Sequence, residues 1–60
     1  MRALVVEDQP DLLRTLARTL RENGYTVDEA VDGAEGLSKA IEIPYDVILL
    51  DVMLPRLDGW

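Results

Sequence analysis

Short apolar runs alternate with amphipathic stretches along the chain. Residues 3–6, 25–30 and 47–50 are rich in aliphatic and β-branched side chains, a pattern typical of short strands. The run at 3–6 is apolar on both faces, which favours a central parallel strand covered by helices on each side. The run at 25–30 carries more polar residues and is expected at an edge of the sheet. The run at 47–50 is the most apolar of the chain.

The first amphipathic stretch predicts a helix that begins at Pro10, because proline is well suited to the first helical position. It is expected to end at Asn23-Gly24, a pair suited to a left-handed cap. Its apolar face follows helical spacing and consists of Leu12, Leu13, Leu16, Ala17 and Leu20.

The second amphipathic stretch begins with the signature of a capping box. The Asp32 carboxylate can accept from the amide of Glu35, and the Glu35 side chain can reach back. Pro44 is expected to terminate this shorter helix. Its apolar positions are Leu37, Ala40 and Ile41.

The resulting order, β-α-β-α-β, predicts an α/β fold with a three-stranded parallel sheet. Right-handed crossovers allow the strand order 1-2-3, with the polar second strand in the middle, or 2-1-3, with one helix on each face. Because the second strand is the most polar, the order 2-1-3 is favoured.

The composition excludes several classes of protein and of functional site. The sixty residues include no cysteine and no histidine, which excludes disulfides, thiolate metal sites and most hydrolase arrangements. No apolar run approaches the roughly 20 residues of a membrane span, and the amino terminus does not resemble a secretory signal, so we expect a cytoplasmic protein without membrane association. The net charge of −6 disfavours direct binding to DNA and suits a cation or a basic partner.

Three acidic residues follow the predicted inner strands. Glu7 and Asp8 end the first strand, and Asp51 ends the third. In the order 2-1-3 these ends are neighbours, at the switch point where open α/β sheets bind ligands. Oxygen ligands of this kind suit Mg²⁺, and a carboxylate beside the metal can act as a nucleophile toward a phosphoryl group. The alternative is that these are ordinary strand-end acids, with Asp8 helping to cap the first helix.

These motifs resemble the receiver domain of bacterial two-component response regulators. The resemblance rests on residues 5–10 (VVEDQP) and 47–59 (VILLDVMLPRLDG), supported by 23–27 (NGYTV) and 30–37 (AVDGAEGL). Residues 51–60 are most similar to the subfamily whose receivers control a winged-helix DNA-binding domain.

The resemblance implies a flavodoxin-like fold with strand order 2-1-3-4-5, of which residues 1–60 would form the amino-terminal part: strands 1–3 and helices 1–2, without strands 4–5 and the later helices. Asp51 would be the phosphoacceptor and a sensor histidine kinase the donor. Asp8 would bind Mg²⁺ directly, Glu7 through a metal-bound water, and Met53 through its backbone carbonyl. The chain would be a signalling module and not an enzyme, and it would act on DNA only through an output domain outside these residues.

Other interpretations remain open. The exposed edge of the third strand favours a self-associating half-domain, a homo-oligomer without working phosphorylation. An aspartate-nucleophile phosphatase is disfavoured, because Pro10 and Met53 stand two residues after Asp8 and Asp51, where that chemistry usually needs an acid. The basic residues Arg14, Arg18 and Arg21 would form either a solvated helix face or a docking surface for the kinase. The two tyrosines, Tyr25 and Tyr45, are expected to be packing residues.

Overall fold

The computed structural model describes residues 1–51, and of Asp51 it describes the backbone alone. Strands and helices alternate along this part of the chain, as predicted. The elements are β1 (Arg2–Glu7), α1 (Pro10–Glu22), β2 (Thr26–Ala30), α2 (Gly33–Glu42) and β3 (Val47–Asp51).

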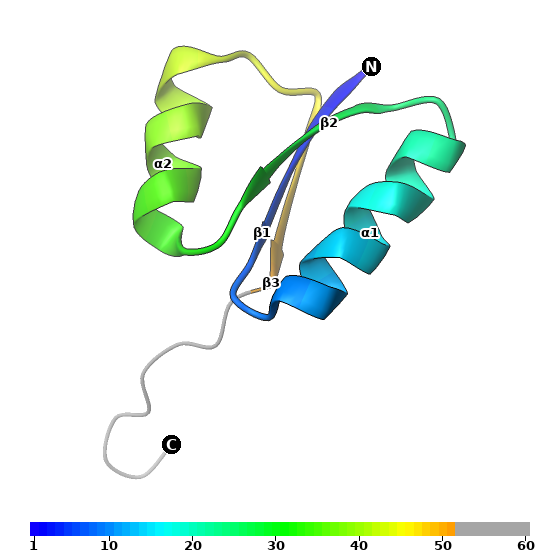
Figure 1. Ribbon diagram of the computed structural model, residues 1–60. Helices are drawn as coiled ribbons and strands as arrows, with labels where there is room; N and C mark the ends of the chain where they lie inside the picture. The colour runs from blue at the N-terminus through cyan, green and yellow to red at the C-terminus, as the bar shows by residue number, and fades with distance from the viewer. Residues whose placement is uncertain (52–60) are drawn as a thin grey trace, which may run out of the picture.

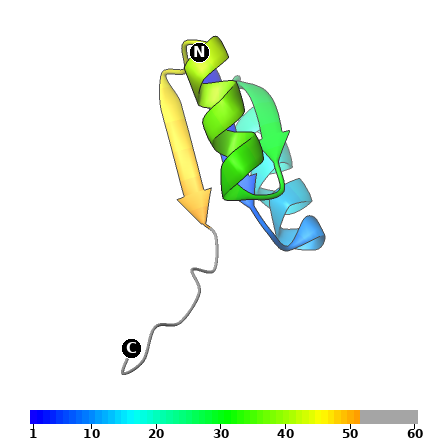
Figure 2. The same cartoon turned by 90° about the vertical axis from the view of Figure 1, so that its left-hand side faces the viewer.

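The three strands form one parallel sheet in the order β2-β1-β3, which confirms the predicted fold class and strand order. The helices α1 and α2 lie on opposite faces of the sheet (Figure 1). Both pack mainly on β1 and β2, and of β3 only Val47, among the described residues, packs against the core on the α1 side. In Figure 2, β3 accordingly stands beside α2 without cover from it. The sheet is therefore a helix-covered pair of strands with one sparsely covered strand at its edge.

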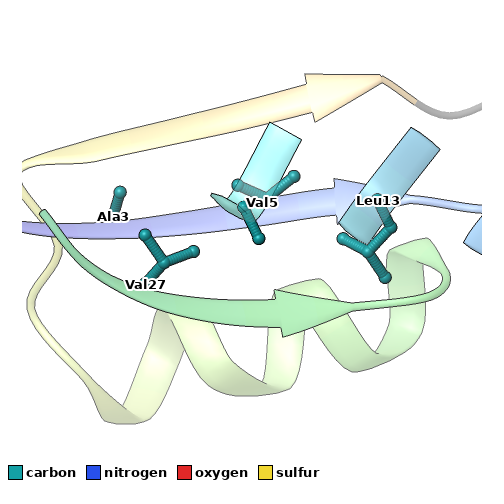
Figure 3. Close-up of a cluster of buried hydrophobic side chains, with 5 residues drawn as sticks. Ala3, Val5, Leu13 and Val27 are labelled. Carbon is teal, nitrogen blue, oxygen red and sulfur yellow. The ribbon is translucent and has the colours of Figure 1, made fainter. Parts of the chain in front are cut away.

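Two small cores lie on the two faces of β1. Successive residues of a strand point to opposite faces, so Ala3 and Val5 face α1 whereas Leu4 and Val6 face α2. The core on the α1 side also contains Leu13, Ala17 and Val27 (Figure 3). Because β1 contributes to both cores and is paired on both sides, the whole of its apolar run is buried. This explains why its sequence lacks the alternation of a half-exposed strand.

The helix ends follow the predicted signals closely. Pro10 is the first residue of α1, and Gly24 follows its end with a φ of +89°, in the left-handed region that glycine adopts readily. At α2, the Asp32 carboxylate accepts from the Glu35 amide at 2.7 Å. The Glu35 side chain was expected to reach back to the start of the helix. Instead, its carboxylate pairs with Lys39 at 3.4 Å.

The packing face of α2 differs from a simple apolar stripe. Leu37 and Ile41 are 64% and 75% exposed, although they belong to the apolar positions that mark the helix. The buried position is Gly36, where an added Cβ would lie only 2.6 Å from a methyl group of Val6. The helix thus approaches β1 through a glycine, and its larger apolar side chains lie beside this contact.

At the amino-terminal end of the sheet, β1 is fastened to the loop before β3 by two reciprocal hydrogen bonds. The amide of Arg2 donates to the Asp46 carboxylate at 2.8 Å, and the amide of Asp46 donates to the Arg2 carbonyl at 2.8 Å. This pair sets the register in which Ala3 lies opposite Val47. No helix among the described residues is long and apolar enough to cross a membrane.

Candidate functional site

The carboxyl ends of β1 and β3 lie side by side, and this is the feature that positions the candidate site. Glu7 and Asp51 are register partners, the last residues of their parallel strands. Their strands are neighbours only because the order is β2-β1-β3, in which the chain reverses direction across the sheet after β2. The backbone thus brings together two of the predicted acidic positions, which are 44 residues apart in number (51 minus 7).

Glu7 is a buried carboxylate, only 2% exposed. Its Oε1 accepts a hydrogen bond from the backbone amide of Gln9 at 3.0 Å, which folds the chain tightly between β1 and α1. A buried carboxylate is tolerated where hydrogen-bond donors or cations compensate for lost hydration. This environment sets Glu7 apart from an ordinary solvated acid at the end of a strand.

Asp8 follows β1 directly and is exposed to solvent. The residue that caps α1 is Gln9, and its side chain makes no capping hydrogen bond. The alternative role for Asp8, capping the first helix, is therefore not the one it has in this structure. Asp8 lies directly after Glu7, on the short connection between β1 and α1.

The remaining predicted ligands lie at the limit of the described structure. The side chain of Asp51 and the whole of Met53 are outside the described residues. Within residues 1–50, no group of three metal-ligating side chains comes together. The predicted ligand set requires Asp51 and Met53 in addition to Glu7 and Asp8.

The donors on the β1 side fit a hard divalent cation. They are carboxylate oxygens at the carboxyl end of a parallel sheet, one buried and one exposed, and such oxygens are the ligands that Mg²⁺ prefers. Mg²⁺ commonly uses one or two carboxylates together with water and phosphate oxygens, so Glu7 and Asp8 would supply part of the ligand set of such a site. When bound, the cation would offset the repulsion among the acids and polarise a phosphoryl oxygen.

A second polar cluster, which sequence reasoning missed, lies away from these acids. The carboxylate of Asp28 on β2 accepts from the Tyr45 hydroxyl at 2.6 Å and from the Arg2 guanidinium at 3.0 Å. The hydrogen bond from Tyr45 is the main cause that lowers the pKa of Asp28, with Arg2 adding to it against the opposing effect of desolvation. Tyr45 packs against the core on the α2 side, as expected of a packing residue, but its hydroxyl also joins β2 to the loop before β3.

The three arginines of α1 do not act as one surface. Arg14 and Arg18 are exposed, and Arg14 lies 3.7 Å from the Asp11 carboxylate. Arg21 instead turns toward β2, where it pairs with Glu29 at 3.0 Å. The basic stripe is thus reduced to Arg14 and Arg18, with Arg21 engaged in holding the helix against the sheet.

The family model of the response regulator receiver domain matches residues 3–60 of the chain. The chain belongs to the receiver family. The resemblance seen in the acidic pair and in the segment after β3 is thereby confirmed, together with the partial flavodoxin-like fold that the described strands and helices display.

Several curated relatives are transcriptional regulators by name. The chain is 47% identical over 60 residues to the transcriptional regulatory protein TcrA of Mycobacterium tuberculosis, covering all of this chain and 24% of TcrA. It is 50% identical over 58 residues to the transcriptional regulatory protein PrrA of Mycobacterium leprae, covering 97% of this chain and 25% of PrrA. It is 48% identical over 60 residues to the transcriptional activator IrlR of Burkholderia pseudomallei, covering all of this chain and 26% of IrlR. The chain spans about a quarter of the length of these relatives.

Proposed function

We propose that this receiver sequence is a phosphoacceptor that takes a phosphoryl group from a sensor histidine kinase onto Asp51. The observation that carries the proposal is the register of β1 and β3, which aligns the backbone of Asp51 with that of Glu7 at the carboxyl ends of neighbouring strands. In the reaction, a carboxylate oxygen of Asp51 forms a bond to phosphorus. The bond between phosphorus and the kinase histidine breaks, and the histidine nitrogen keeps the electron pair.

The neighbouring acids would prepare the site for this transfer. Asp8 would bind Mg²⁺ directly, the buried Glu7 would hold a metal-bound water, and the backbone carbonyl of Met53 would complete the protein ligands. The burial of Glu7 and the exposure of Asp8 support this division, because a direct ligand needs access to the cation while a buried one can orient its water.

The output of the phosphorylated receiver would be regulation of transcription in the cytoplasm. The relatives that carry transcriptional names are about four times longer than this chain, so DNA binding would belong to an output domain outside these sixty residues. The net charge of −6 agrees with this division, since an acidic receiver has no electrostatic attraction for DNA.

The proposal is tested by intact-mass analysis after incubation with a small phosphodonor and Mg²⁺. We expect partial addition of one phosphoryl group, because the hydroxyl and lysine residues that the family uses on later strands are not among these sixty residues. The addition should disappear in Asp51→Asn and on chelation of Mg²⁺. Addition that persists in Asp51→Asn would refute the assignment of the acceptor.

A second candidate function is self-association through β3 without productive phosphorylation. It is favoured by the exposure of Ile48 and Leu50, at 52% and 65%, on a strand that neither described helix covers. Apolar side chains on an open strand edge favour pairing with another strand. Sedimentation of the chain at micromolar concentration separates the two cases: a compact monomer would contradict self-association and leave the phosphoacceptor proposal intact.

A further inference from the structure

The carboxyl end of α1 carries the pair Asn23-Gly24 inside a closed cap. The Tyr25 amide donates to the Leu20 carbonyl at 3.1 Å, and the Gly24 amide donates to the Arg21 carbonyl at 3.0 Å. These two bonds, with Gly24 at a φ of +89°, form the Schellman arrangement of a helix end. Leu20 and Tyr25 also pack against the core on the α1 side, so the cap is continuous with that core.

Asparagine followed by glycine is a pair that is chemically suited to spontaneous deamidation. The glycine nitrogen loses its proton to base and forms a bond to the side-chain Cγ of asparagine, whose nitrogen takes up a proton and leaves as ammonia. Water then opens the resulting succinimide ring to aspartate, or to isoaspartate, in which the backbone runs through the side chain. Glycine favours this reaction because it has no side chain to hinder the attack. Asn23 is the only asparagine of the sequence, and it is exposed to solvent.

The folded chain holds both reacting groups of this pair in hydrogen bonds. The Gly24 amide, which would be the nucleophile, donates to the Arg21 carbonyl. The Asn23 Nδ2, which would leave as ammonia, donates to the Thr19 carbonyl at 2.8 Å. Ring closure also requires the Gly24 nitrogen and the Asn23 Cβ on the same side of the Cα–C bond, whereas the ψ of 17° at Asn23 turns them nearly to opposite sides. The cap therefore opposes deamidation as long as it is closed.

We propose that Asn23 is a site of spontaneous deamidation, which the cap of α1 keeps slow and which reacts when the end of the helix opens. Opening releases the Gly24 amide and the Asn23 side chain together, because the last turn of α1 holds both. Helix ends open at a lower cost in free energy than the core of a fold. Isoaspartate adds an atom to the backbone, so the two cap bonds cannot form again in the same geometry. Either product places a negative charge at the carboxyl end of the helix, where the macrodipole disfavours it.

The test follows deamidation by mass spectrometry with peptide mapping at mildly alkaline pH. It compares the full chain with a synthetic peptide of residues 19–27, which carries the same Asn23-Gly24 pair without the packed helix. We expect the full chain to react at least about tenfold more slowly than the peptide, because only the opened fraction can react. Gln9, the only glutamine, precedes Pro10, whose nitrogen carries no hydrogen and cannot close the corresponding ring, so the change in mass reports on Asn23.

Two variants of the full chain locate the opening. Thr19→Gly weakens the last turn of α1, and Thr15→Gly is the matched control one turn earlier, since both threonines are exposed and each hydroxyl donates to the carbonyl four residues before it. Thr19→Gly should deamidate several-fold faster than the native chain, and Thr15→Gly should remain close to it, with circular dichroism showing that both are folded. Hydrogen exchange at the Gly24 amide of the native chain measures the same opening without any substitution, and its protection should match the slowing of deamidation.

Each other result counts against the proposal. A full chain that deamidates as fast as the peptide shows that the cap gives no protection. An Asn23 that stays unmodified even in Thr19→Gly removes the modification site. Equal acceleration in Thr19→Gly and Thr15→Gly places the reaction in the globally unfolded chain and overturns local opening. A Gly24 amide that exchanges without protection, while deamidation is slow, separates the two and overturns the role of the cap.

Discussion

The hydroxyl of Tyr45 donates to the carboxylate of Asp28 at 2.6 Å, which joins the loop before β3 to the edge strand β2 across the intervening β1. Arg2, on β1, donates to the same carboxylate and lies 6.0 Å from the centre of the Tyr45 ring. The cluster therefore links β1, β2 and the loop before β3 outside the hydrogen-bond ladder, and the carboxylate at its centre has a lowered pKa.

Replacement of Tyr45 by phenylalanine should raise the pKa of Asp28, because the hydrogen bond from Tyr45 is the main cause of its depression. A carboxyl whose pKa is lower in the folded state stabilises the fold above its ordinary pKa of 3.8, and this stability is lost as the pH falls through the folded value. Tyr45→Phe should therefore lose stability at neutral pH and show a smaller further loss on acidification. NMR titration of Asp28 measures the change in its pKa, and chemical denaturation at neutral and at acidic pH measures the change in stability.

Tyr25→Phe is the matched control, because Tyr25 packs against the core on the α1 side and Asp28 is not its partner. Its pH dependence should equal that of the native chain. If both variants lose the same stability at both pH values, the link between Tyr45 and Asp28 has no energetic role.

Gly36→Ala should destabilise the fold by about 1–3 kcal/mol, since overpacking a core position costs this much. The added Cβ would lie 2.6 Å from a methyl group of Val6, which is itself buried on β1. The intrinsic preference of alanine for helices, about 0.5–1 kcal/mol, offsets part of the cost. Gly33→Ala is the control, because no atom lies within 4 Å of an added Cβ there. Urea denaturation that gives equal midpoints for the two variants would contradict the close approach of α2 to β1.

Asp8→Asn should weaken Mg²⁺ binding by about tenfold or more, because even residues behind the direct ligands typically contribute this much to metal affinity. Asp11→Asn changes the charge equally on the first turn of α1 and should leave the affinity nearly unchanged. Chemical-shift titration with Mg²⁺ measures both. The double variant Asp8→Ala, Asp51→Ala should abolish binding, and unchanged binding in that variant would eliminate the proposed site.

Leu49→Lys should prevent self-association by placing a charge on the open edge of β3, a position where lysine discourages strand addition. Leu12→Lys provides a close match, because Leu12 and Leu49 are 36% and 37% exposed and Leu12 lies on α1. Sedimentation should give a monomer for Leu49→Lys and unchanged self-association for Leu12→Lys. Identical behaviour of the two variants would place the interface elsewhere.

The sequence predicted the features that depend on local capping signals and on how polar the residues of each strand are. Pro10, Gly24 and Asp32 mark helix ends correctly because capping is decided within a few residues. The polar character of residues 25–30 gave the strand order, and the order brought Glu7 and Asp51 to neighbouring strand ends.

Features that depend on contacts between elements could not be predicted in this way. The α2 helix packs on β1 through Gly36 and leaves Leu37 and Ile41 exposed. This orientation of the helix depends on how closely it approaches β1 and β2. Likewise, Tyr45 meets Asp28 only through the register of three strands, and Arg21 leaves the basic stripe because the outward carbonyl of Val27 lies within its reach. No spacing along the chain encodes these contacts.

The reciprocal bonds between Arg2 and Asp46 have a consequence at the far end of the sheet. Parallel strands that keep the same faces buried can slip only in steps of two residues, roughly 6.6 Å. The alignment of Glu7 with Asp51 is therefore determined five residues away, about 16 Å along β1, by a pair that touches neither acid. A substitution that removes the Asp46 carboxylate would therefore weaken the alignment at the candidate site, although Glu7, Asp8 and Asp51 are themselves unchanged.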